Sequence, residues 1–153
     1  MYITTSRKPS DQTRKFARLF ANFIGVYENR GKKSIDEAVA RARELGEHRI
    51  IILSESKGNP NAINFISINN EWAWMEPEIT FSSESSKLPD TKGIRKQVKY
   101  DGDKIYSNLF DFQEPDTDDV VVVGMNDKHL SFSYGKLKFS VNITRLRKLS
   151  KTD

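Results

Sequence analysis

Residues 4–16 read Thr4-Thr5-Ser6-Arg7-Lys8-Pro9-Ser10-Asp11-Gln12-Thr13-Arg14-Lys15-Phe16 and lead from a predicted strand into a predicted helix. Ser10 is a suitable N-cap, because its hydroxyl can accept a hydrogen bond from a free backbone N–H of the first helical turn. Five apolar side chains then recur on one helix face: Phe16, Leu19, Phe20, Phe23 and Ile24. This period predicts a helix over residues 10–24 that ends at Gly25.

A second helix is marked by the S-x-x-E capping box of Ser34 and Glu37, in which each side chain accepts a bond from the backbone of the other residue. The helix is expected to end at Gly46. Its apolar stripe consists of Ile35, Ala38, Val39, Ala42 and Leu45. This is the most clearly bounded element in the sequence.

Strands are predicted on both sides of these helices. Residues 2–5 and 25–28 flank the first helix, and the β-branched run of residues 49–53 is typical of a strand covered on both faces. That run should form a hairpin with residues 62–68 through the turn at residues 57–60. The alternation of strands and helices predicts an α/β fold with a mixed sheet.

The second half of the chain has a similar order of elements. A strand at residues 72–81 is followed by residues 82–93, which lack an apolar period and are interpreted as an exposed connector. Beyond it we predict a strand at 94–100 and a short helix at 101–112, with Ile105, Leu109 and Phe110 pointing inward. A buried strand is expected at 120–123. A meander with turns at 126–127 and 134–135 should follow, with Lys136 and Lys138 facing solvent. We therefore expect a single domain over residues 1–153 with two similar halves, about 1–81 and 94–153.

The charge is unevenly distributed along the chain. The formal net charge is only +4, with 37% hydrophobic and 30% charged residues among 153. Residues 1–33, however, hold eight Lys or Arg and two Asp or Glu, whereas residues 101–119 hold seven acidic residues and one lysine. With no secretory segment and no apolar run of about 20 residues, we predict a cytoplasmic protein that does not bind membranes.

Chemistry-bearing residues offer little support for catalysis. Without cysteine there is no thiolate nucleophile or disulfide, and two histidines, His48 and His129, cannot alone form an ordinary zinc site. The carboxylates of Glu76 and Glu78, or the acidic group at residues 116–119, could act as acid–base pairs or magnesium ligands, but solvated loop carboxylates are the simpler interpretation. We predict no enzyme, no metal, no cofactor and no small-molecule substrate.

The basic surplus falls at two helix entrances, where a polyanion would be expected. The N-terminus of a helix carries free N–H groups and a partial positive charge, so Ser10 and Thr13 with Arg14 could receive a phosphate. The stretch Asn29-Arg30-Gly31-Lys32 is either an ordinary loop, with Gly31 at a positive φ, or a second phosphate-binding loop. The turn at Lys57 is either a plain hairpin turn or a place where Lys57 contacts RNA. The predicted RNA-binding residues are Ser6, Arg7, Lys8, Ser10, Thr13, Arg14, Lys15, Arg18, Arg30, Lys32, Lys33 and Lys57.

Four aromatic residues have two interpretations. Phe65, Trp72, Trp74 and Phe81 could stack on bases, as in single-strand binders. Their alternation along the predicted strands favours positions in the core instead.

Several of these motifs resemble the Brix-domain family of ribosome-assembly proteins: residues 3–10, the Thr13-Arg14 pair with Phe16, residues 29–32, and residues 55–60. The similarity covers roughly residues 2–68, and the short chain resembles the minimal archaeal form. The resemblance implies two halves, each akin to the anticodon-binding module of class II aminoacyl-tRNA synthetases. It also implies a non-catalytic role in pre-ribosomal RNA processing and subunit assembly.

The predicted partners are ribosomal RNA or its precursor and, at the acidic stretch, another ribosome-assembly protein. Two alternatives remain open. One is a tRNA anticodon-type RNA-binding accessory module, because the implied fold is shared, and the other is a protein-interaction scaffold whose basic face is incidental.

Overall fold

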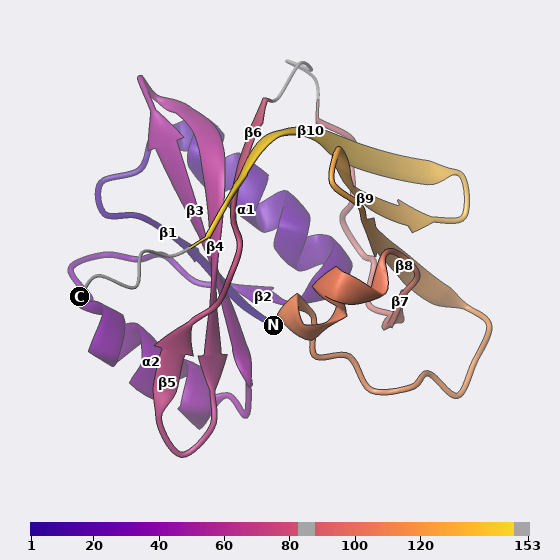
Figure 1. Cartoon of the computed structure of the whole chain (residues 1–153), viewed down its shortest axis with the longest axis horizontal. Coiled ribbons are helices and arrows are strands. Elements are labelled where there is room, and N and C mark those ends of the chain that lie inside the picture. The colour runs from indigo at the N-terminus through magenta and orange to yellow at the C-terminus, as the bar shows by residue number, and fades with distance from the viewer. Residues whose placement is uncertain (83–87, 149–153) are drawn as a thin grey trace.

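The computed structural model describes residues 1–82 and 88–148, and within them ten strands form one continuous sheet in the order β2-β1-β3-β4-β6-β10-β9-β8-β7, with β5 paired to β4 (Figure 1). The elements are β1 (Tyr2–Thr5), α1 (Asp11–Ile24), β2 (Val26–Tyr27), α2 (Ile35–Glu44), β3 (Arg49–Ser56), β4 (Asn59–Ile68), β5 (Trp72–Trp74), β6 (Glu78–Ser82), β7 (Gln97–Tyr100), the 3-10 helix η1 (Lys104–Leu109), β8 (Val120–Met125), β9 (His129–Tyr134) and β10 (Leu137–Arg147). The predicted α/β class with a mixed sheet is confirmed.

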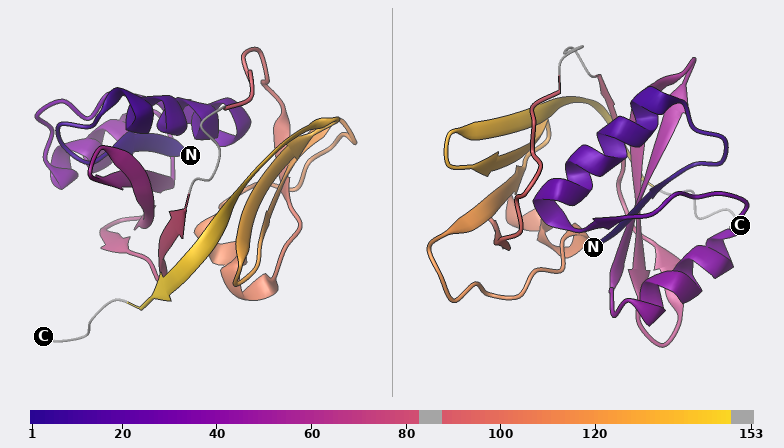
Figure 2. Two further views of the ribbon diagram at one scale, coloured as in Figure 1. Left: turned by 90° about the horizontal axis from the view of Figure 1, so that it is seen from above. Right: turned by 180° about the vertical axis from the view of Figure 1, so that it is seen from behind.

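The first part of the sheet is covered on both faces by helices. Strand β1 runs parallel to β2 and β3, and β3 forms the predicted antiparallel hairpin with β4. Alternate residues of β3 point to opposite sides, so Ile51 packs with α1 while Ile50 and Ile52 pack with α2. The strands run between the two helices (Figure 2, right). This two-sided cover explains the uninterrupted apolar run that predicted β3.

Helix α1 lies between the first part of the sheet and the second. Strand β10 leaves the β9 hairpin and pairs with β6, which joins both parts into one sheet (Figure 1). The ring of Phe20 in α1 lies 4.8 Å from the ring of Phe132 in β9, and Phe16 stacks on Phe81 of β6 at 5.4 Å. Both parts of the sheet therefore share one hydrophobic core, built around α1.

The second part has a strand arrangement comparable to the first. A parallel pair, β7 and β8, is followed by the antiparallel strands β9 and β10 of the predicted meander. In the first part, β1 and β3 are the parallel pair and β4 follows antiparallel. The division of a single domain into two similar halves stays a prediction, which this common order supports.

Both predicted helix starts are confirmed in atomic detail. The Ser10 hydroxyl accepts a hydrogen bond from the Thr13 N–H at 3.2 Å, and both bonds of the Ser34–Glu37 capping box form. The second helix ends at Glu44, however, and Leu45, expected in its apolar stripe, is exposed. Leu45 lies outside the last turn and so leaves the buried face.

The short helix predicted at residues 101–112 is a 3-10 helix over six residues, and the inward position of Ile105 is wrong. A 3-10 helix has three residues per turn, so Tyr106 and Leu109 share its buried side while Ile105 is 78% exposed. Leu109 and Phe110 are buried as predicted.

Several predicted strands have different bounds or burial. Residues 72–81 divide into β5 and β6 on either side of a cis Glu76–Pro77 bond, and residues 94–100 become strand only from Gln97. Strand β8 is buried only at alternate residues, because the sheet is covered there on one face. Of the four aromatics assigned to the core, Phe65 and Phe81 are buried, Trp72 is half-buried and Trp74 is 41% exposed at the β5 edge. In the predicted connector, residues 83–87 lie outside the described part, and residues 88–93 have no regular structure. The prediction that the connector is exposed is wrong at Thr91, which is 3% exposed and is bonded to Asn22 of α1.

Candidate nucleic-acid interface

The predicted cations lie on loops that leave one end of the parallel strands. Strands β1, β2 and β3 are parallel, so the loops that follow them emerge at the same end of the sheet. These loops carry Lys8 after β1, Arg30 and Lys32 after β2, and Lys57 after β3. In open α/β sheets the carboxyl ends of parallel strands are the usual place for ligands.

The start of α1 is occupied by a carboxylate of the protein itself. Glu55 of β3 accepts hydrogen bonds on one oxygen from the Ser10 N–H at 2.9 Å and from the Thr13 hydroxyl at 2.5 Å. The hydroxyl of Thr13, and next the N–H of Ser10, hold the pKa of Glu55 below its usual value. The Ser10 hydroxyl donates to the Gly58 carbonyl at 2.7 Å. A phosphate at the position predicted from the sequence would have to displace Glu55.

Arg30 supports the loop between β2 and α2 from inside. Its side chain is only 7% exposed, its Nε donates to the Lys33 carbonyl at 2.8 Å, and its Nη1 donates to the Thr5 carbonyl at 3.1 Å. Burial, and then the nearby charge of Arg7, lower the pKa of Arg30. Gly31 has a φ of +56°, a value that glycine adopts without strain. Arg30 thus fixes the loop that presents Lys32 to solvent.

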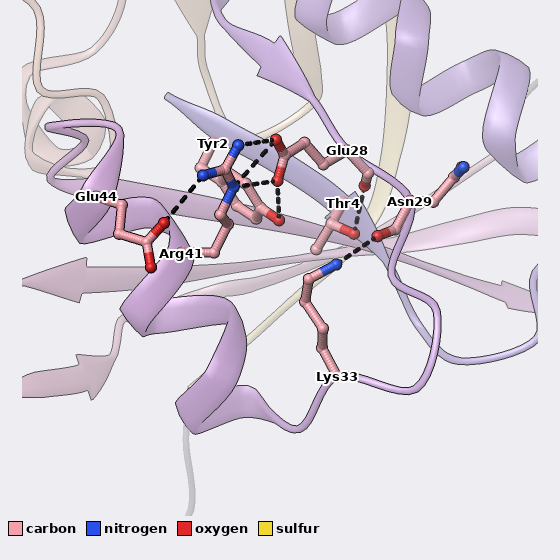
Figure 3. Close-up of polar contacts among 7 residues, drawn as sticks. All are labelled: Tyr2, Thr4, Glu28, Asn29, Lys33, Arg41 and Glu44. Atoms are coloured by element: carbon pink, nitrogen blue, oxygen red, sulfur yellow. Dashed lines mark hydrogen bonds and ion pairs between the residues drawn. The ribbon is translucent and has the colours of Figure 1, made fainter.

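A polar network anchors the same loop where it begins (Figure 3). Arg41 of α2 donates to both carboxylate oxygens of Glu28, at 2.8–3.2 Å, and these bonds hold the pKa of Glu28 below its usual value. The Tyr2 hydroxyl donates to Glu28 at 3.1 Å, and burial, followed by the charge of Glu28, raises the pKa of Tyr2 to about 12. The Thr4 hydroxyl donates to the Glu28 carbonyl at 2.8 Å, and Lys33 donates to the carbonyl of Asn29 at 3.2 Å. Strand β1 and helix α2 together therefore hold the loop in place.

Five of the predicted cations line a single hollow of about 570 Å³, which we call the basic hollow. It is lined by Lys8, Pro9, Arg14, Arg18, Asn29, Arg30, Gly31 and Lys32. The two helix entrances named from the sequence therefore meet on one side of the molecule. No acidic side chain lines this hollow among the residues that the structure describes.

The arginines of the basic hollow each have a partner within the protein. Arg14 forms a 2.5 Å ion pair with Asp11, a side chain that is almost fully exposed. The guanidinium of Arg18 lies over the ring of Tyr27, 5.2 Å from its centroid. An exposed ion pair is weak in water, and a guanidinium stacked on an aromatic ring keeps its edge donors available. Both side chains can therefore still contact a phosphate.

A curated relative from Methanosarcina barkeri is 30% identical over 163 residues, which cover 97% of this chain and 99% of the relative. It is described as a probable Brix domain-containing ribosomal biogenesis protein. The chain belongs to this family. The resemblance noted from the sequence is thereby confirmed, although no protein-family model matches this Brix-domain chain.

Further comparisons agree with the family. A Pyrococcus furiosus relative of the same description is 40% identical over 80 residues, which are 49% of this chain and only 35% of the relative. A crystal structure of a probable ribosomal biogenesis protein from Aeropyrum pernix has a TM-score of 0.70 at 20% identity, covering 98% of this chain and 96% of that one. The crystal structure of Mil, an archaeal Imp4-like protein, has a TM-score of 0.63 at 23% identity, covering 96% and 99%. At these identities the two structures show a common fold.

The other predicted contacts of this Brix domain lie outside the basic hollow. Arg7 and Lys15 are exposed, and Ser6 is half-buried with its N–H bonded to the Leu53 carbonyl at 2.9 Å. Lys57 is exposed in the two-residue turn between β3 and β4, at a φ of 52°. The bond from the Ser10 hydroxyl to Gly58 places this turn beside the start of α1.

The sequence analysis missed two features. One is the internal anion Glu55, and the other is a second group of cations, Lys92, Arg95 and Lys96, on the segment before β7. The signal that could have identified this second group is the presence of three cations within five residues, at the junction of the predicted connector and the predicted strand at 94–100.

In the described part of the chain, no cluster of three or more histidine or acidic side chains is arranged to hold a metal ion. Within the same residues, no helix combines the length and apolar character needed to cross a bilayer.

Proposed function

We propose that this Brix domain assists ribosome assembly by binding ribosomal RNA or its precursor at the basic hollow, without catalysing a reaction. Its relatives are named as ribosomal biogenesis proteins, and their names give the cellular process. The observation that carries the RNA contact is the meeting of Lys8, Arg14, Arg18, Arg30 and Lys32, from two separate loops and a helix, in one hollow.

Each cation would have a distinct part in binding. Lys8 and Lys32 are exposed, and no ion pair involves either within the described residues, so they would contact phosphates directly. Arg14 and Arg18 would add further contacts along α1, while Arg30 would mainly hold the loop in shape. Phosphate contacts position a nucleic acid without reading its sequence. Selectivity would therefore come from RNA shape and 2′-hydroxyl groups.

The test is the salt dependence of RNA binding by the variant Lys8→Gln with Lys32→Gln. Each phosphate contact on a single strand contributes a slope of about −0.7 in log affinity against log salt, so the loss of two contacts should make the slope about 1.4 units shallower. The matched control is Lys136→Gln with Lys138→Gln, two exposed lysines that line neither the basic hollow nor the second hollow described below. Ribosomal RNA transcripts and transfer RNA serve as probes, and circular dichroism verifies folding.

The outcomes separate the alternatives. A slope in the Lys8–Lys32 variant equal to that of the control would reject the basic hollow as the contact. Preference for transfer RNA over ribosomal RNA would favour the anticodon-type accessory module. Absence of salt-dependent binding to any RNA by the unmodified protein would instead favour a protein-interaction scaffold.

A further inference from the structure

A second hollow of about 830 Å³ lies between the two parts of the molecule, and we call it the inter-half groove. One wall is the later part of α1 together with β2, and the other is the segment of residues 92–98. This segment runs beside α1 (Figure 2, right). The Asn22 side chain of α1 donates to the hydroxyl of Thr91 at 2.9 Å, and Thr91 is only 3% exposed. A partly buried hydrogen bond therefore holds the two walls of the groove together.

The inter-half groove has an excess of positive charge. Its lining includes four cations, Arg18, Lys92, Arg95 and Lys96, and one carboxylate, Glu47. That carboxylate is paired with the α-amino group of Met1 at 3.0 Å. Lys96 is paired with Asp119 at 2.7 Å. Lys92 and Arg95 are exposed and form no ion pair within the described residues, which leaves two cations for a ligand.

Apolar surface lies beside these charges. Val26 of β2 is 37% exposed, and the half-buried Tyr27 and Ile94 also line the groove. A positively charged track that combines cations with aromatic and apolar side chains is typical of proteins that hold single-stranded nucleic acid.

The groove adjoins the basic hollow at one shared lining residue. Arg18 lines both, and its guanidinium lies over Tyr27, whose hydroxyl donates at 2.7 Å to Asn29 of the basic hollow. From Arg14 in the basic hollow to Ile24 in the groove, α1 rises about 15 Å at 1.5 Å per residue. A single RNA strand lying along α1 would therefore meet both hollows.

We propose that the inter-half groove binds single-stranded RNA as a continuation of the strand held in the basic hollow, with Lys92 and Arg95 contacting phosphates. The proposal rests on the proposed function, because it extends the same RNA along α1. A peptide strand added to β2, which is an edge strand of the sheet, is the competing occupant. The shared Arg18 and the unpaired cations favour RNA.

The first test measures the binding of a twelve-nucleotide oligouridylate by two double variants. One carries both Lys92→Gln and Arg95→Gln, and the control carries both Lys136→Gln and Lys138→Gln. Loss of two phosphate contacts should make the salt slope about 1.4 units shallower, so the fall in affinity between 50 and 200 mM salt should be about 7-fold smaller than in the control. An unchanged slope would overturn the groove proposal. The Lys8–Lys32 variant tests the basic hollow separately, so a failure of the groove is distinguished from a failure of the proposed function.

The second test locates the RNA. Because the chain contains no cysteine, Val26→Cys can carry a single photocrosslinker in the groove, with Lys138→Cys as the control position. Crosslinking of the oligouridylate from position 26 but not from position 138, and its loss when Lys92→Gln and Arg95→Gln are added, is the expected result. No RNA crosslink at position 26 under conditions where the protein binds the oligomer, or a crosslink there to a peptide alone, would overturn the proposal.

Discussion

Replacement of Glu55 by glutamine should destabilise the protein by about 1–2 kcal/mol at neutral pH. The carboxylate accepts two hydrogen bonds at the start of α1, from the Ser10 N–H and the Thr13 hydroxyl. A hydrogen bond to a charged acceptor contributes about 1 kcal/mol more than one to a neutral acceptor. The charge also gains a few tenths of a kcal/mol from the helix dipole. Because Glu55 is only half-buried, solvent screening keeps the total toward the lower end.

The stability difference between the wild-type protein and Glu55→Gln should depend on pH. The hydrogen bonds lower the pKa of Glu55 in the folded protein below its usual 4.5. A depressed carboxyl pKa contributes stability that is fully present above the unfolded pKa and is lost as pH falls through the folded pKa. Glutamine does not titrate, so the gap between the two proteins should be largest near pH 7 and should shrink at about pH 3.

The assay is urea denaturation followed by circular dichroism at both pH values, with thermal melting as a second measure. A loss of 1–2 kcal/mol corresponds to a decrease in Tm of about 2–8 °C for a domain of this size. Glu71→Gln, at an exposed acidic residue in the turn between β4 and β5, is the matched control. Equal stability at pH 7, or a difference that persists undiminished at pH 3, would refute the role assigned to Glu55.

Two further predictions concern the shared core and the β3–β4 turn. Phe132→Ala should lower the free energy of unfolding by about 3–5 kcal/mol, because its ring packs on Phe20 of α1. Tryptophan fluorescence from Trp72 and Trp74 should shift to lower urea together with circular dichroism, and a fluorescence midpoint that stays at the wild-type value would contradict a common core. Lys57→Asn should raise the free energy of unfolding by up to about 1 kcal/mol, because asparagine tolerates the positive φ of this turn better. Urea titration checks this. An RNA affinity of Lys57→Asn below that of the Lys136→Gln, Lys138→Gln control would support the predicted contact between Lys57 and RNA.

Local interactions explain why the helices could be predicted. The bonds that begin α1 and α2 join residues three apart, Ser10 with Thr13 and Ser34 with Glu37. The apolar periods were equally local and identified the buried faces of both helices. Where the outcome depended on distant partners, the sequence was less informative. The exposure of Ile105 follows from three residues per turn in η1, and that of Trp74 from its position on a strand with one neighbour.

The basic hollow was partly predictable from the expected order of strands and helices. A parallel order of strands brings the loops after β1 and β2 to one end of the sheet, so cations in both loops meet. The occupation of the α1 terminus by Glu55 could not be read from the sequence, because this residue is 45 positions from Ser10 and reaches it only through the pairing of β1 with β3. The inter-half groove likewise depends on how the segment before β7 packs against α1.

Helix α1 explains why one element can serve both stability and binding. Its apolar face, with Phe16 and Phe20, packs against both parts of the sheet, so the helix cannot move without disturbing the core. Its polar face places Arg14 and Arg18 along the line that joins the basic hollow to the inter-half groove. Arg14 and Arg18 are thus carried on a helix fixed by the core, and their contacts with Asp11 and Tyr27 already restrict their side chains, which lowers the entropic cost of binding. An RNA strand lying along α1 would contact both parts of the molecule through a helix that already joins them.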